Sequence, residues 1–148
     1  MFRSATLLAL AVALLAAGCA EAKPGPNTVN GLVLVTEPGS AWRVDQTCAP
    51  AEEFKDLAKG TEVVVKDGSG KVLGRSTLPV GAGEQDDSTD RHDSETHICE
   101  YLFAVPGVAT TKTYVVKVGD RPEVTVSQDD MKARFWTVSF EFPGPAPQ

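Results

Sequence analysis

Apolar and polar residues alternate in several stretches of the chain. The alternation is clearest in 134–142, RFWTVSFEF, where four apolar residues share one face: Trp136, Val138, Phe140 and Phe142. A period of two is typical of a strand with one buried face. The same pattern predicts strands in 98–105, with Cys99 on the apolar face, and in 113–119 and 122–127.

A hairpin and a first strand complete the predicted sheets. Residues 61–67 alternate, 67–70 (Asp-Gly-Ser-Gly) have the composition of a tight turn, and 71–78 form the return strand. The apolar run 31–37, GLVLVTE, is closed by Pro-Gly and predicts the first strand of the domain. With about seven short strands, we expect an all-β fold, a two-layer antiparallel β-sandwich.

Helical patterns occur in two short stretches. In 50–60, a leading proline, early glutamates and a closing glycine predict one or two turns that pack Phe54 and Leu57 onto the sheet. Ser127 predicts a cap for a single turn over 128–131. We therefore expect no more than one or two helical turns beside the strands.

The N-terminus follows the layout of an export signal. Arg3 precedes an apolar run through Ala17, which is too short for a bilayer-spanning helix of roughly 20 residues. Residues 16–19, AAGC, resemble the lipobox of bacterial lipoprotein precursors, which implies cleavage before Cys19 and a diacylglycerol on its thiol. The alternative is an ordinary secretory signal cut near 16–18, which leaves Cys19 as a free thiol.

The number of cysteines supports the lipobox interpretation. The chain has three cysteines, and an odd thiol in an exported protein needs an explanation. Lipidation of Cys19 leaves Cys48 and Cys99 as a pair, which predicts a disulfide. Disulfides are common outside the cytoplasm, so export and the pairing support one another. On the loop-entropy model such a bridge contributes about 4 kcal/mol to stability.

These features divide the chain into four parts. We expect a signal peptide in 1–18, a lipidated N-terminus and polar tether in 19–30, the β-sandwich domain in 31–142 and a disordered tail in 143–148. The domain would lie on the extracytoplasmic face of the cell membrane, held in the lipid bilayer through Cys19.

The charge of the chain restricts its partners. The formal net charge is −6, and removal of Arg3 with the signal peptide makes the rest of the chain more acidic. Nucleic-acid binding needs a basic face, so we expect no nucleic-acid partner. The overall charge likewise gives little reason to expect adhesion to anionic lipids.

Two sets of motifs resemble known families. The order of GTEVVVKDGSGKVLG, EYLFAVPGV and TYVVKVGD resembles prealbumin-like or carboxypeptidase-regulatory-like sandwiches. A cysteine before an F-x-D-L-x-x-G-T segment (54–61) and another before Y-x-F-x-V-P (101–106) resemble small uncharacterised lipoproteins of actinobacterial type. These resemblances imply a fold and supply no catalytic residues. An immunoglobulin-like topology stays open, because strand number does not fix the order of connections.

One acidic stretch could hold a cation. Residues 79–96 have no period, so we expect a long solvated loop. Aspartates and histidines gather in 84–97, and the candidate metal ligands are Asp86, Asp87, Asp90, His92, Asp93 and His97. Carboxylates suit calcium, and imidazoles with carboxylates suit zinc, although the spacing matches no EF-hand loop. The alternative is a loop that binds no metal.

The remaining motifs point away from catalysis. The sequence has no nucleophile elbow, P-loop or dinucleotide fingerprint, so we expect no enzyme and no cofactor beyond a divalent cation in the acidic loop. Aromatic residues at strand spacing are expected in the core rather than in a ligand groove. The sequence predicts a membrane-anchored lipoprotein that binds another envelope protein or stabilises the cell envelope. The alternative is a ligand- or divalent-metal-binding lipoprotein that uses 84–97.

Overall fold

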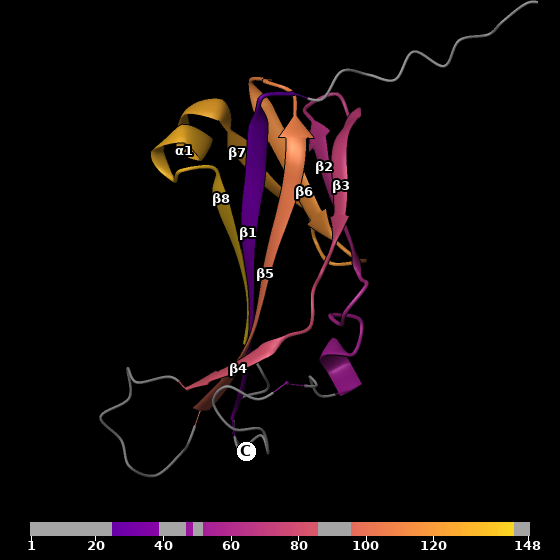
Figure 1. Ribbon diagram of the computed structural model, residues 1–148, viewed down its shortest axis with the longest axis vertical. Helices are drawn as coiled ribbons and strands as arrows, with labels where there is room; N and C mark the ends of the chain where they lie inside the picture. Colours follow the sequence, from indigo (N-terminus) through magenta and orange to yellow (C-terminus); the bar gives the residue numbers. More distant parts are fainter. Residues whose placement is uncertain (1–24, 39–46, 49–51, 86–95, 144–148) are drawn as a thin grey trace, which may run out of the picture.

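A two-layer β-sandwich forms the part of the chain that the computed structural model describes, namely residues 25–38, 47–48, 52–85 and 96–143. Within these ranges, eight strands form two sheets of four strands around one hydrophobic core (Figure 1). The predicted fold class is confirmed. No helix within these ranges is long and apolar enough to cross a membrane.

The two sheets have different strand orders. Sheet A has the order β4-β5-β1-β8 and contains β1 (Asn27–Pro38), β4 (Ala82–Gln85), β5 (Thr96–Val108) and β8 (Thr137–Pro143). Sheet B has the order β3-β2-β6-β7 and contains β2 (Glu62–Asp67), β3 (Val72–Thr77), β6 (Thr113–Val118) and β7 (Val124–Ser127). Neighbouring strands are antiparallel except β1 and β8, which run parallel.

The core forms where the apolar faces of the strands meet, as the alternation predicted. In β5 the residues Cys99, Tyr101, Phe103 and Val105 are buried at every second position, and Val108 at the end of the strand is buried as well. From β8, Val138 and Phe140 enter the same core, and the rings of Phe103 and Phe140 lie 6.5 Å apart. Gly31 is the cross-strand neighbour of Phe103, and a Cβ there would lie 1.8 Å from the ring. Phe103 therefore fills the space that Gly31 leaves.

Both predicted helical stretches are present and short. A 3-10 turn, η1 (Glu52–Phe54), lies in the first of them, and Phe54 and Leu57 are buried as expected. Helix α1 (Gln128–Ala133) follows β7, and its Asp130 N–H donates to Ser127 Oγ at 3.1 Å. The predicted Ser127 cap is confirmed.

Several boundaries differ from the predictions. Strand β1 begins at Asn27 rather than Gly31, and β5 continues past Pro106 to Val108. The stretch expected as a loop from 79 to 96 contains β4, which pairs with β5. The residues of β4 show no apolar alternation that would predict a strand. Backbone pairing with β5 holds β4 in the sheet. The predicted signal peptide, Cys19 and most of the tail lie outside the described residues.

Candidate functional site

The disulfide lies at the end of the sandwich where η1 packs. Cys48 and Cys99 are bonded, with their Cα atoms 5.8 Å apart, as the sequence predicted. Both residues are buried, and Gly81 lies directly against them. A Cβ on Gly81 would lie 2.8 Å from each sulfur atom and 2.7 Å from Tyr101 Cε1. The bridge, the tyrosine ring and the bare backbone of Gly81 therefore form one tightly packed unit.

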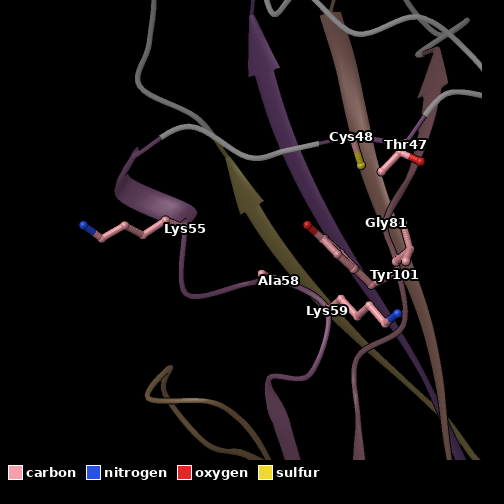
Figure 2. A pocket seen from close by; sticks show the side chains of 8 residues that line it. Thr47, Cys48, Lys55, Ala58, Lys59, Gly81 and Tyr101 are labelled. Carbon is pink, nitrogen blue, oxygen red and sulfur yellow. The ribbon is translucent and has the colours of Figure 1, made fainter.

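A cavity of about 390 Å³ opens beside this unit (Figure 2). Its lining includes Thr47, Cys48, Lys55, Lys59, Gly81 and Tyr101. Figure 2 shows Tyr101 at its centre, whereas the Lys55 ammonium points away, and that ammonium donates to Glu52 Oε1. The lining residues bring hydroxyl and ammonium groups but no carboxylate or imidazole, so they do not provide a general-base pair.

Arg121 holds the wall of this end in place. Its Nε donates to Asp56 Oδ2 at 2.7 Å, and its Nη2 donates to the Glu53 carbonyl at 2.7 Å and to Asp56 Oδ1. The guanidinium also lies 5.1 Å from the ring centroid of Phe54 and 5.3 Å from that of Phe142. The hydrogen bond from Arg121 is the main reason that the pKa of Asp56 falls below its ordinary value of 3.8, against a smaller opposing effect of burial. This arrangement is a structural clamp.

Strand β8 forms an open edge of sheet A over the described part of the chain. It is seven residues long, and Glu141 is the one charged residue in it. The Trp136 carbonyl accepts the N–H of Asn30 in β1 at 2.8 Å. Backbone groups alternate sides along a strand, so those of Ser139 and Glu141 are directed to the open edge, whereas the Thr137 N–H already donates to the Arg134 carbonyl at 3.0 Å. The edge thus offers backbone donors and acceptors to an added strand.

An exposed aromatic residue lies at the start of this strand. Phe135 is 86% exposed, and both Phe135 and Trp136 adopt positive φ angles, 52° and 62°. Trp136 packs edge-on against Tyr114, with ring centroids 5.5 Å apart. Phe135 has no comparable core contact. In the alternation of 134–142, Phe135 falls on the polar face of the strand. This position indicates that its side chain lies at the surface rather than in the core.

The predicted metal ligands cannot be assembled from the described residues. Asp86, Asp87, Asp90, His92 and Asp93 lie outside them, and for His97 the structure gives the backbone position in β5, opposite Gln85. Within the described ranges no group of three or more His, Cys, Asp or Glu side chains could hold a metal ion. Metal binding by 84–97 stays a prediction, which calcium and zinc titrations of the melting temperature test.

Comparison with known proteins adds no relative. The chain matches no protein-family model, no curated protein and no solved structure.

Proposed function

We propose that the chain is a lipid-anchored extracytoplasmic protein whose sandwich binds another envelope protein by adding that partner's strand to β8. The open edge of β8 carries the proposal. Of the four sheet edges, β4 and β7 are only four residues long, and β3 carries the exposed Arg75. Short strands protect an edge from pairing, and β8, with seven residues, is the longest of the four edge strands and carries one charged residue, Glu141. Strand addition is an established mode of peptide recognition.

Two features of the chain support the anchor and the compartment. The AAGC sequence at 16–19 resembles a lipobox, and the Cys48–Cys99 disulfide is of the kind that persists outside the cytoplasm. A lipid chain on Cys19 would keep the domain at the membrane surface, where its partners would also lie. The mass of the mature protein tests the anchor: a diacylglycerol on an N-terminal Cys19 is expected, and an unmodified N-terminus would contradict it.

Photo-cross-linking in intact cells tests the partner. A photoreactive residue in place of Glu141 should capture one defined envelope protein, identified by mass spectrometry. Ser139→Pro removes an N–H from the open edge and should abolish the capture, because proline cannot donate to an added strand. Ser139→Ala is the matched control, since it removes the hydroxyl and keeps the N–H. Circular dichroism checks that both variants are folded. Equal capture by the two folded variants would refute strand addition at β8.

A further inference from the structure

One end of the sandwich collects the start of β1, helix α1 and Phe135. The Gly25 N–H donates to the Gly107 carbonyl at 2.5 Å, and the Asn30 N–H donates to Trp136 at 2.8 Å. The Gln128 N–H, at the start of α1, donates to Lys112 at 2.9 Å. Figure 1 shows α1 beside the indigo beginning of β1. We call this end the tether end, because the chain from Cys19 enters the domain there.

Phe135 at the tether end is unfavourable in two respects. It is 86% exposed, and its φ of 52° is rare for a residue with a side chain. Backbone strain of this kind persists where the surrounding structure enforces it, and it clusters at functional sites. Here the packing of Trp136 on Tyr114 fixes the turn and leaves Phe135 projecting into solvent. An exposed apolar side chain held in this way is suited to insertion into another apolar phase.

The charges around Phe135 differ from those of the whole chain. Lys132 and Arg134 flank it, both exposed, and neither forms an ion pair with a described residue. Lys71 and Lys112 add cations from neighbouring turns of this end. The carboxylates here are Asp67, which accepts from Ser69 and the Lys71 N–H, Asp129, and Asp130, which binds Ser127. Four cations against three carboxylates give the tether end a net charge of about +1, although the chain carries −6.

The tether is short. Only residues 20–24 separate Cys19 from Gly25, and in any conformation the chain from Cys19 to Gly25 spans at most about 20 Å. An anchor at Cys19 would therefore keep the tether end within that distance of the lipid head groups. A projecting aromatic ring with flanking Lys and Arg is the side-chain set of an interfacial membrane contact, in which the ring reaches roughly 5–10 Å into the head-group boundary.

We propose that the tether end rests on an anionic bilayer, with Phe135 inserted at the lipid interface and Lys132 and Arg134 on the head groups. The proposal rests on anchoring through Cys19. In this orientation the strands of sheet A point away from the membrane, so that the open edge of β8 extends outward from the bilayer.

Fluorescence quenching by brominated anionic lipids tests this orientation. The full mature chain is coupled through the Cys19 thiol to a maleimide lipid, which sets the anchor whether or not cells lipidate it. Phe135→Trp and Leu102→Trp form a matched pair, because Leu102 is also exposed, at 64%, but lies on the outer face of sheet A. In the register of sheet A, Leu102 lies opposite Leu32, which lies opposite Ser139, so Leu102 is up to about 13 Å further along the strands than Phe135.

The expected result is several-fold stronger quenching in Phe135→Trp than in Leu102→Trp. The difference should fall in 1 M salt and on adding Lys132→Glu and Arg134→Glu, because the head-group contacts are electrostatic. Equal quenching of the pair, or stronger quenching in Leu102→Trp, would overturn the orientation, and so would quenching unaffected by the charge reversals. Cross-linking of residue 135 to a protein in cells, without quenching by lipid, would overturn it in favour of a protein interface. A native protein without lipid on Cys19 would instead refute the proposed anchor. The mass of the mature protein detects that outcome independently of the quenching experiment.

Discussion

Arg121 and Asp56 form an ion pair with two hydrogen bonds, although 65 positions separate them in the chain. The pair joins the turn after β6 to the segment after η1, and two phenyl rings lie beside the guanidinium, which leaves the Arg121 side chain 21% exposed and that of Asp56 39% exposed. The hydrogen bonds that residues 52–58 form among themselves are local, such as that from the Leu57 N–H to the Phe54 carbonyl at 2.8 Å. The position of the η1 segment on the end of the sandwich therefore depends on the Arg121–Asp56 contact and on burial of Phe54 and Leu57.

Replacing the guanidinium should weaken this end more than a surface ion pair would suggest. Arg121→Lys retains the charge but loses the paired geometry and the ring stacking, so we expect unfolding free energy to fall by about 1–2 kcal/mol. Urea denaturation followed by tryptophan fluorescence measures the change. Arg75→Lys is the control, because its pair with Glu62 is more than half exposed, and we expect about 0.5 kcal/mol or less. Equal losses in both variants would contradict the clamp.

The same pair predicts a pH dependence. Because the pKa of Asp56 is lowered in the folded protein, mainly by the hydrogen bond from Arg121, its contribution is complete above the ordinary value of 3.8. It is lost as pH falls through the lowered pKa. The stability difference between the native protein and Asp56→Asn should therefore be constant at neutral pH and shrink below about pH 4. A difference that persists at pH 2 would show that Asp56 acts by shape rather than by charge.

Gly81 should tolerate no side chain. Its Cβ would collide with both sulfur atoms and with the ring of buried Tyr101, so we expect Gly81→Ala to cost about 1–3 kcal/mol. Gly68→Ala is the matched control, since the nearest atom there is a side-chain carbon of Thr113 at 3.3 Å. Loss of the disulfide by Cys48→Ala with Cys99→Ala should cost about 4 kcal/mol on the loop-entropy model. If Gly81→Ala were neutral in thermal unfolding, the packed unit would be less rigid than its geometry indicates.

Replacing Phe135 with glycine should increase the stability of the folded protein. A left-handed conformation costs an ordinary residue about 1–2 kcal/mol, and glycine avoids this cost while making the unfolded chain more flexible. We expect Phe135→Gly to raise the unfolding free energy by about 0.5 kcal/mol. Trp136→Gly should instead lower it by about 2 kcal/mol, because its ring packs against Tyr114. A destabilised Phe135→Gly would mean that the exposed ring has a structural role.

The buried face of each strand was predictable from the sequence, because side chains alternate between the two faces of a strand and apolar residues at every second position mark the buried face. Cys99 on the apolar face of β5 placed the disulfide in the core, and Trp136, Val138, Phe140 and Phe142 all contact that core. Neighbour relations were not predictable. The parallel pairing of β1 with β8 depends on how α1 returns the chain to sheet A, and alternation within a strand carries no information about its partner.

Strand β4 and the backbone conformation of Phe135 were harder to predict from the sequence. Strand β4 has the sequence AGEQ, whose backbone pairs with β5, and Gly83 lies opposite Cys99. At Gly81, just before β4, the disulfide leaves no room for a side chain, and a run of small residues resembles a loop in sequence. Phe135 was visible as an aromatic residue in a polar register, but its left-handed backbone was not, because it follows from the way that Trp136 ends the turn after α1.

The place of β1 within sheet A has a mechanical consequence. Its first residues follow the tether, and it lies between β5 and β8, with hydrogen bonds along both sides. With the proposed anchor at Cys19, a pull on it would act along the axis of a central strand and would load two ladders together in shear, rather than peeling one strand from an edge. Resistance to such a pull is set by the unfolding rate under load. In the proposed arrangement, in which the membrane holds the first strand and a partner holds the last, the domain would carry tension between the two.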